Sequence, residues 1–563
     1  MEVTMLPEEI LSLICAELGR ERDFRCLYNC ARSSKSLADA ALRTMYQYHE
    51  LSPAFNYTED TVQQKDESFE GKQAASQRYF RKWTVLWRSI ICSSLEPSTT
   101  YKPYCRYLRI IDFRNLSDMV ESTHFRAAKR SFYAKPLSRF SHVRQQDKFE
   151  MVDVVATINA IGETVIPKAT LLEEISGHLR PGFLTRWILQ APRLRQMVLW
   201  KGDALGQEAG NAVARNCEYF DALTIHGWLD PDADEVFATF LNDLNRDTLR
   251  YLHIISFNNI CQRSFEALGR HSTIKELILN NLSREAMENL DALKSCTQLE
   301  LLSLEDSSRN VRLEELNHDV FTEVIAWLSS CTKLRDITIK SFFDGPSILA
   351  AVAVAPDVKW FKLCLQGYTV RNASSASFHT ALSDQKYLES LFLSGSGEDT
   401  HPHDLEIMVS SICQLANLKE LFLKQVSDEF DMTHITNLAL NLPLLEEFWT
   451  SGGEISSDIL PLLANLRNLR NLTLNALTQF DLSAILDFVH RLDPEKQKGF
   501  SLSLMAVDQD FALTEEELQL VTESMKAQVD GHFGKQPSYA FFSLPLWKQL
   551  TFVVGDFISK EVY

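Results

Sequence analysis

An apolar pattern that returns at nearly even spacing constrains the fold of this chain more than any other feature of its sequence. Apolar residues occupy the first, fourth and sixth positions of a short segment, as in Leu299, Leu302 and Leu304. Successive copies start 24 to 35 residues apart, and chance matches would not be spaced so evenly. The copies start at Leu194, Phe220, Leu249, Ile274, Leu299, Leu334, Val358, Leu388, Leu418, Leu445 and Leu469.

Each interval between copies also holds a helical stretch. In one of them, Phe321, Val324 and Leu328 are spaced as on one face of a helix. One strand and one helix per repeat predict an α/β fold: a leucine-rich-repeat solenoid shaped as a horseshoe, with parallel strands on the concave side and helices on the convex side. We interpret the longest interval as containing an insertion at residues 307–319.

The concave side of such a solenoid offers a binding surface. Side chains alternate along a strand, so the residue between the second and third apolar positions faces this side. Three neighbouring copies place Phe392, Phe422 and Trp449 there, and we call these three residues the aromatic row. We predict that the row, with Lys362 and Lys424, binds a protein substrate. The alternative is that the aromatic segment 538–554 covers the row.

The first 50 residues predict three short helices. Pro7 suits the first position of a helix, and Gly19 is expected to end it. Asp23 can cap a second helix, and Ser33 or Ser34 a third. Three short helices bury little apolar surface, so this part needs a partner or the rest of the chain for stability. The apolar stripe on the first helix comprises Ile10, Leu11, Ile14 and Leu18.

Residues 6–18 and 23–42 resemble an F-box, with Leu6 and Pro7 opening the first helix and two further helices at matching spacing. In that family the motif binds a Skp-family adaptor, which joins it to a cullin-RING ubiquitin ligase. The alternative is an amphipathic helical cap on the solenoid. The resemblance implies an adaptor-binding surface formed by Leu6, Pro7, Ile10, Leu11, Ile14, Leu18, Phe24, Leu27 and Cys30.

The sequence between the F-box and the even repeats is less regular. Aromatic residues at 79–90 predict a helix with one buried face, and residues 108–113 predict an early strand. This region resembles that of uncharacterised fungal F-box proteins. The 86 residues from Leu108 to Leu194 leave room for about three repeats, and we place a strand near residues 151–158. The predicted segments are an F-box (1–50), a polar linker or loop (51–78), a leading helix with irregular first repeats (79–190), leucine-rich repeats (191–505) and a C-terminal cap or tail (506–563).

Composition excludes several classes of partner. The chain has 57 basic and 75 acidic residues, a formal net charge of −18, which argues against nucleic-acid binding. It has no signal peptide and no apolar run of membrane-spanning length, so we expect a soluble cytoplasmic or nuclear protein that binds no membrane. The 11 cysteines are expected to be reduced thiols. Cys217, Cys296 and Cys331 precede predicted strands by three residues, as in the cysteine-containing leucine-rich repeats found behind F-boxes.

No catalytic motif is present in the sequence. Phosphate-binding loops, nucleophile elbows, zinc-protease motifs and dinucleotide fingerprints are all missing. His401, His403 and Asp404 are close in sequence, but polar residues in a turn are usually just solvated. We therefore expect no enzymatic activity, no metal and no cofactor. The prediction is a substrate-recognition subunit of a Skp-cullin-F-box ubiquitin ligase, which acts in ubiquitin conjugation by protein-protein interaction; the alternative is an interaction scaffold with no link to ubiquitin.

Overall fold

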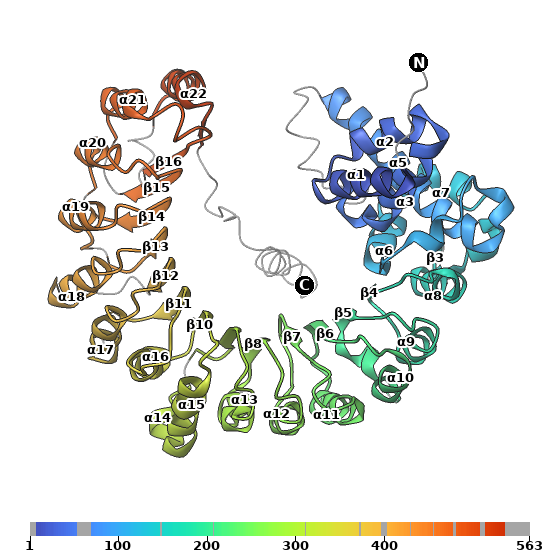
Figure 1. The fold of residues 1–563 in the computed structure, drawn as a ribbon, viewed down its shortest axis with the longest axis horizontal. Coiled ribbons are helices and arrows are strands. Elements are labelled where there is room, and N and C mark those ends of the chain that lie inside the picture. Colours follow the sequence, from blue (N-terminus) through green and yellow to red (C-terminus); the bar gives the residue numbers. More distant parts are fainter. Residues whose placement is uncertain are drawn as a thin grey trace. The chain divides into compact units, whose positions relative to one another are not determined.

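The computed structural model describes residues 7–52, 69–146, 149–206, 208–309, 311–370, 373–395, 402–427, 429–453, 455–476, 480–506 and 513–534. The chain divides into two compact units, Met1–Leu249 (unit 1) and Arg250–Tyr563 (unit 2). In both units strands and helices alternate along the chain (Figure 1), and neighbouring strands are parallel except in one antiparallel hairpin at residues 143–152. This is the predicted α/β architecture of a leucine-rich-repeat solenoid.

Unit 1 contains the N-terminal helices and the first strands of the solenoid. Its helices are α1 (Glu8–Arg20), α2 (Phe24–Ser33), α3 (Lys35–Gln47), η1 (His49–Leu51), α5 (Phe69–Leu95), η2 (Pro97–Thr99), η3 (Tyr104–Tyr107), α6 (Phe113–Glu121), α7 (Phe125–Phe132), η4 (Leu137–Phe140), α8 (Val154–Val165), η5 (Ile166–Lys168), α9 (Pro181–Ile188), η6 (Gly202–Leu205), α10 (Ala209–Asn216) and α11 (Ala233–Asp243). Its strands are β1 (Ile110–Asp112), β2 (Val143–Gln146), β3 (Phe149–Val152), β4 (Glu174–Gly177), β5 (Gln196–Lys201) and β6 (Ala222–Gly227).

The early part of unit 1 differs from the sequence prediction. Strand β1 lies where an early strand was expected, but it pairs directly with β4, and β4 pairs with β5. Among the described residues, a single parallel strand thus separates β1 from β5, where about three repeats were expected. Residues 151–158 do not form a repeat strand, because Met151 and Val152 belong to the antiparallel hairpin β2–β3 and α8 follows at once.

Helix α5 and its neighbours form an aromatic core in unit 1. The predicted stripe on this helix is confirmed, since Phe80, Trp83 and Trp87 are buried. Both indole N–H groups donate to Asn115 Oδ1 of α6, at 2.6 Å from Trp83 and 2.9 Å from Trp87. A buried polar group without a partner costs free energy, so this shared acceptor lets two tryptophans be buried together.

Unit 2 contains the even repeats. Its strands are β7 (Tyr251–Ile254), β8 (Glu276–Leu282), β9 (Leu301–Asp306), β10 (Asp336–Lys340), β11 (Lys362–Tyr368), β12 (Ser390–Gly395), β13 (Glu420–Lys424), β14 (Glu447–Gly452), β15 (Asn471–Ala476), β16 (Ser501–Ala506) and β17 (His532–Phe533). Its helices are α12 (Gln262–Leu268), α13 (Arg284–Met287), η7 (Leu290–Leu293), α14 (Leu313–Leu316), α15 (His318–Ser330), α16 (Gly345–Ala353), α17 (Ala373–Leu382), α18 (Pro402–Ile412), α19 (Met432–Asn441), η8 (Ser457–Ile459), α20 (Leu460–Leu463), α21 (Leu482–Arg491) and α22 (Glu515–Val529).

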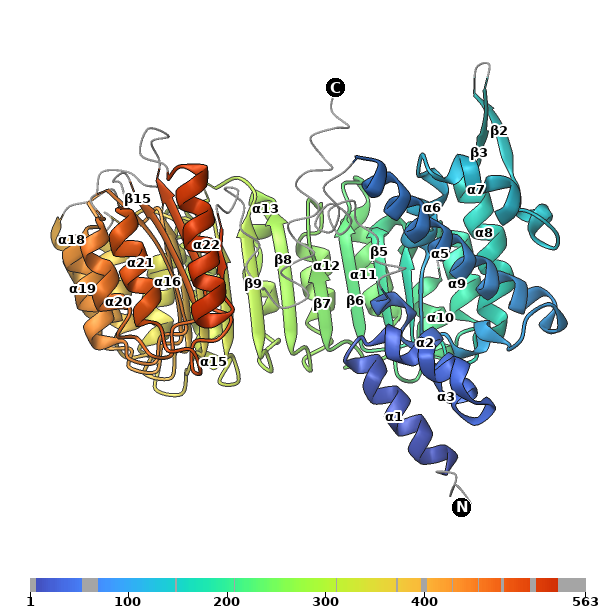
Figure 2. The ribbon, with the colours of Figure 1, turned by 90° about the horizontal axis from the view of Figure 1, so that it is seen from above.

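In unit 2 the strands pair in chain order, and equivalent apolar residues stack on one another. Figure 2 shows β7, β8 and β9 side by side. Leu302 of β9 is in register with Ile337 of β10, and the equivalent residues from β7 to β16 are buried. The predicted insertion contains the short helix α14, which lies between β9 and α15. Burial of these stacked residues against the helices is the main stabilising force of such a fold.

One repeat has a different register from the prediction. The pattern starting at Val358 predicts that Phe361 is buried in the core, but Phe361 is 37% exposed. Trp360, Leu363 and Leu365 are buried instead. Leu363 is in register with Ile337 and Leu391, which fixes the alignment. The reason is a two-residue insertion: Val358 closes the turn by donating its backbone N–H to Ala355 O, as Leu334 does to Cys331 O in the preceding repeat.

The cysteines ahead of the strands are buried, as the sequence predicts. Cys217, Cys296 and Cys331 lie in the turns between helix and strand, and burial raises the pKa of each thiol to about 12. Cys217 Sγ lies 3.5 Å from Ala191 O, and Cys331 Sγ lies 3.6 Å from Cys296 O. These thiols are protonated at neutral pH and are poor nucleophiles or metal ligands, so their role is packing.

Two glycines in helices of unit 1 provide a test of core packing. A Cβ atom at Gly162 of α8 would overlap the indole ring of Trp187, whereas a Cβ at Gly182 of α9 would have no atom within 4 Å. We expect Gly162→Ala to lower the free energy of unfolding by roughly 1–3 kcal/mol through overpacking. Gly182→Ala should leave it unchanged or raise it by up to about 1 kcal/mol, because alanine restricts the unfolded chain. Thermal melts of the two variants check this, and equal melting temperatures would contradict it.

Candidate protein-binding surfaces

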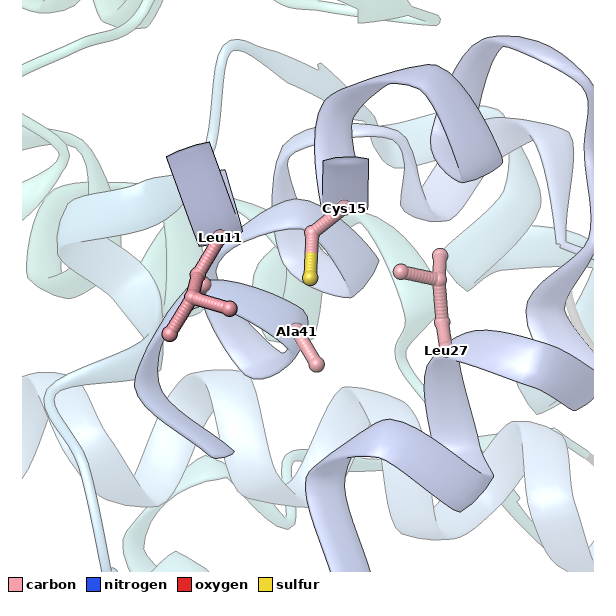
Figure 3. Close-up of a cluster of buried hydrophobic side chains, with 5 residues drawn as sticks. Leu11, Cys15, Leu27 and Ala41 are labelled. Carbon is pink, nitrogen blue, oxygen red and sulfur yellow. The ribbon is translucent and has the colours of Figure 1, made fainter. Parts of the chain in front are cut away.

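Helices α1, α2 and α3 pack around a small core of their own. Figure 3 shows Leu11, Cys15, Leu27 and Ala41 at its centre. Asp23 Oδ1 accepts the backbone N–H of Cys26 at 2.8 Å, which confirms the predicted start of the second helix.

The third helix is capped by the second of the two candidate serines, because Ser34 Oγ accepts the backbone N–H of Leu37 at 3.3 Å. The expected end of α1 at Gly19 is wrong, since the helix continues to Arg20. Gly19 instead allows close packing: a Cβ there would lie 2.7 Å from Thr44 Cγ2 and 2.8 Å from the ring of Tyr48.

The opposite side of α1 is apolar and exposed. Ile10, Leu13 and Ile14 are 41%, 62% and 45% exposed, and Pro7 precedes them at the exposed start of the helix. We call these four residues the helical docking face. An α-helix that is apolar on two sides buries one of them in its own core and presents the other to a partner.

The predicted adaptor-binding residues divide between these two sides. Leu11 and Leu27 were expected to contact an adaptor, but they are buried in the helical core and support the surface from within. Leu18, Phe24 and Cys30 are partly buried against that core. Leu6 lies outside the described residues. Leu13 was missed, although its position three residues after Ile10 already places both on one helical face.

The helical part is attached to the beginning of the solenoid within unit 1. The ring of Tyr46 in α3 stacks on that of Tyr104 with centroids 4.2 Å apart, and its hydroxyl lies 2.7 Å from Ser89 Oγ of α5. Burial raises the pKa of Tyr46 to about 12. Lys102 Nζ also pairs with Asp39 Oδ1 at 2.5 Å. These contacts hold the helical docking face in a fixed orientation relative to the first strands.

In unit 2 the aromatic row is assembled as predicted. Phe392 is in register with Phe422, and Phe422 with Trp449, on three adjacent strands. The rings of Phe392 and Phe422 have centroids 5.9 Å apart. Phe392 and Trp449 are half-buried, whereas Phe422, between them, is only 8% exposed. Segment 538–554, the alternative cover for the row, lies outside the described residues.

Charged residues flank the row on the same face of the sheet. Lys424 is exposed, two residues after Phe422. Because of the corrected register, Lys362 is not level with the row; it pairs with Ser390, and Cys364 occupies the position beside Phe392. Lys362 therefore still faces the same side, one step nearer the start of the strands.

Two carboxylates lie on the same face as the row, two residues nearer the start of the strands. Glu420 and Glu447 are in register on adjacent strands. Burial raises the pKa of Glu447, and the neighbouring charge of Glu420 raises it further. Asn471 Nδ2 donates a hydrogen bond to the Glu447 carboxylate at 2.7 Å. Apolar rings beside two adjacent carboxylates suit a ligand that combines an apolar side chain with a positive charge.

The other candidate sites from the sequence acquire no further support. His403 and Asp404 lie at the start of α18, with His403 Nδ1 3.8 Å from Glu406, and His401 is outside the described residues. In the part of the chain that the structure describes, no group of three or more His, Cys, Asp or Glu side chains could hold a metal ion. Likewise, none of the helices in those segments is long and apolar enough to cross a membrane.

Comparisons with known proteins find similarity of fold. No family model matches the chain, and no curated protein matches its sequence. A solved complex of Rad7 and Elc1 from yeast is similar at 14% identity over 64% of this chain and 86% of that chain, with a TM-score of 0.37. An internalin from Listeria monocytogenes is similar at 15% identity over 59% and 82%, with a TM-score of 0.32. A TLR13–ssRNA13 complex is similar at 15% identity over 60% and 49%, with a TM-score of 0.35.

The different burial of Phe422 and Trp449 predicts different effects of truncation. Phe422→Ala should lower the free energy of unfolding by about 3–5 kcal/mol, because it empties a buried site. Trp449→Ala removes a half-buried ring and should cost clearly less. Denaturant unfolding monitored by circular dichroism measures both. Equal, small losses below about 0.5 kcal/mol would instead show that the whole row behaves as exposed surface.

Proposed function

We propose that this chain is the substrate-recognition subunit of a Skp-cullin-F-box type ubiquitin ligase. In this proposal it performs no chemistry of its own. The N-terminal helices bind a Skp-family adaptor, and through it a cullin, while the solenoid holds a protein substrate for ubiquitin transfer by the ligase.

The observation that carries the proposal is the helical docking face. Ile10, Leu13 and Ile14 expose large aliphatic side chains on a helix whose other side is already packed. Apolar residues clustered in this way are typical of protein interfaces, where a few of them supply most of the binding energy. The resemblance of residues 6–42 to an F-box supports a Skp-family adaptor as the partner.

The substrate surface in this proposal is the aromatic row with its flanking charges. Phe392 and Trp449 offer partly exposed rings, and Glu420 and Glu447 lie in register beneath them. A substrate segment with an apolar side chain next to a lysine or arginine would match this surface. Its charge would also relieve the repulsion between the two carboxylates.

A second candidate function is an interaction scaffold with no link to ubiquitin. The packing of α3 on α5 and η3, through Tyr46, Ser89 and Tyr104, supports this alternative. Helices that cover the end of a repeat array are a common way to protect its apolar core from water. A cap alone, however, does not need exposed aliphatic residues on its outer side.

Charge substitution on the helical docking face distinguishes the two functions. The double variant Ile10→Asp, Ile14→Asp should abolish co-purification of the adaptor and cullin, since buried unpaired carboxylates would oppose the interface. Both positions are exposed, so the melting temperature should stay close to that of the wild type. Mass spectrometry of proteins purified with the tagged full-length chain provides the measurement.

Leu189→Asp is the matched control, because Leu189 is 53% exposed in unit 1 but outside the helical docking face. This variant should retain adaptor and cullin. Recovery of the adaptor with the double variant at the wild-type level would refute the assignment of the docking face. Absence of adaptor and cullin from the wild-type preparation would favour the scaffold.

A further inference from the structure

Three side chains from distant parts of unit 1 form a layered stack. Trp200 of β5 and His226 of β6 lie side by side, with ring centroids 4.1 Å apart and planes within 8°. The guanidinium carbon of Arg114, the second residue of α6, lies 5.0 Å from the centroid of the Trp200 ring. We call Arg114, Trp200 and His226 the cationic stack.

Strand β4 lies between β1 and β5, so the contact between Arg114 and Trp200 spans one strand. Ser176 of β4 pairs with Val198, two residues before Trp200, so the residue level with Trp200 is His178, just after β4 ends. His178 is exposed. The stack lies at the carboxyl ends of parallel strands, a common location for ligand sites in α/β proteins.

The stack contains polar groups without partners. Arg114 Nε and His226 Nδ1 are buried and make no hydrogen bond among the described residues. His226 is only 3% exposed. Arg114 Nη2 forms an ion pair with Asp112 Oδ2 at 3.7 Å, which is too long for a hydrogen bond. A buried donor such as Arg114 Nε is costly without an acceptor. The Arg114 side chain as a whole is 38% exposed, so a ligand that supplies acceptors can reach it from solvent.

Three carboxylates lie near Arg114: Asp112, Glu174 and Asp118. Burial raises the pKa of Asp118 to about 6, and the charge of Arg114 opposes this rise. Asp112 and Glu174 already have hydrogen-bond partners. Asp112 Oδ1 caps α6 by accepting the backbone N–H groups of Arg114 at 2.9 Å and Asn115 at 3.3 Å. Glu174 Oε1 accepts the hydroxyl of Ser176 at 2.7 Å. Burial and the nearby Arg114 charge lower the pKa of His226 to about 4, so its ring is neutral at pH 7. Arg114 therefore supplies the positive charge of the stack.

We propose that the cationic stack binds an oxyanion, a phosphoryl or carboxylate group, on a partner polypeptide. The planar guanidinium of Arg114 donates two parallel hydrogen bonds to the oxyanion, which is the geometry it forms best. Trp200 holds the guanidinium flat through a cation-π contact. This site is separate from the helical docking face and from the aromatic row, and it depends on neither of the functions proposed above.

Binding of labelled peptide pools to the full-length protein tests the proposal. Three pools have randomised flanks and a central phosphoserine, glutamate or glutamine, and fluorescence anisotropy at pH 7.5 gives their affinities. The phosphoserine pool, the glutamate pool or both should bind more tightly than the glutamine pool. Preference for phosphoserine over glutamate assigns the phosphoryl group, and equal binding assigns any carboxylate-sized oxyanion.

Variants of Arg114 locate the binding. Arg114→Gln should weaken binding of the anionic pools at least about tenfold, the size expected for losing a charge-assisted hydrogen-bonded pair. Arg114→Lys keeps the positive charge but loses the planar pair of donors, so an intermediate loss of affinity is expected. If Arg114→Gln lowers the melting temperature, the Arg114→Lys variant provides the test instead. Arg180→Gln removes an exposed cation just before α9 and should change nothing.

Two results would overturn the proposal. One is equal affinity of the wild-type protein for all three pools. The other is an anion preference that survives unchanged in both Arg114 variants.

Discussion

The fold depends on one constraint: a single strand-helix repeat cannot bury its own apolar face. Each strand supplies two side chains to the core between strands and helices, such as Leu302 and Leu304. They are shielded from water only when the equivalent residues of the next repeat stack on them. The parallel backbone ladder fixes this stacking in register. Even the repeat with two extra residues keeps it, because Trp360 takes the buried position and its backbone N–H donates to Gln385 Oε1 at 3.0 Å.

The same constraint leaves the other face of each strand free to vary. Because side chains alternate, the residues between these positions face the other side of the sheet and can differ between repeats. In unit 2 this freedom produces the aromatic row above two carboxylates. In unit 1 it places Trp200 and His226 side by side, and Arg114 of α6 completes the cationic stack. A uniform core thus supports two surfaces that differ in charge and apolar character.

The N-terminal helices follow a different physical rule. Their core is small, and α3 is stabilised by its contacts with η3 and α5 in addition to that core. A small unit of this kind buries only part of its apolar surface, so Ile10, Leu13 and Ile14 remain exposed. Attachment to the solenoid gives this exposed face a fixed orientation within unit 1.

The sequence by itself determined the features that depend on local periodicity. The even recurrence of apolar residues spaced as in Leu299, Leu302 and Leu304 predicted the buried strands, and the helical stripes and the caps at Asp23 and Ser34 are equally local signals. The aromatic row could be predicted because its three residues occupy one position of consecutive repeats. By contrast, β4 was missed because its short sequence contains one large apolar residue, Ile175, and gives no periodic signal.

Only the tertiary structure decided between apolar residues that local patterns treat alike. Val358 and Trp360 fit the start of a strand equally well, and the register with β10 and β12 selects Trp360. Leu11 and Ile14 belong to one predicted stripe, but packing of α2 and α3 buries the first and exposes the second. Trp200 and His226 are far apart in sequence, and parallel strand pairing places them at one level of the sheet. Arg114 reaches the indole of Trp200 from the first turn of α6.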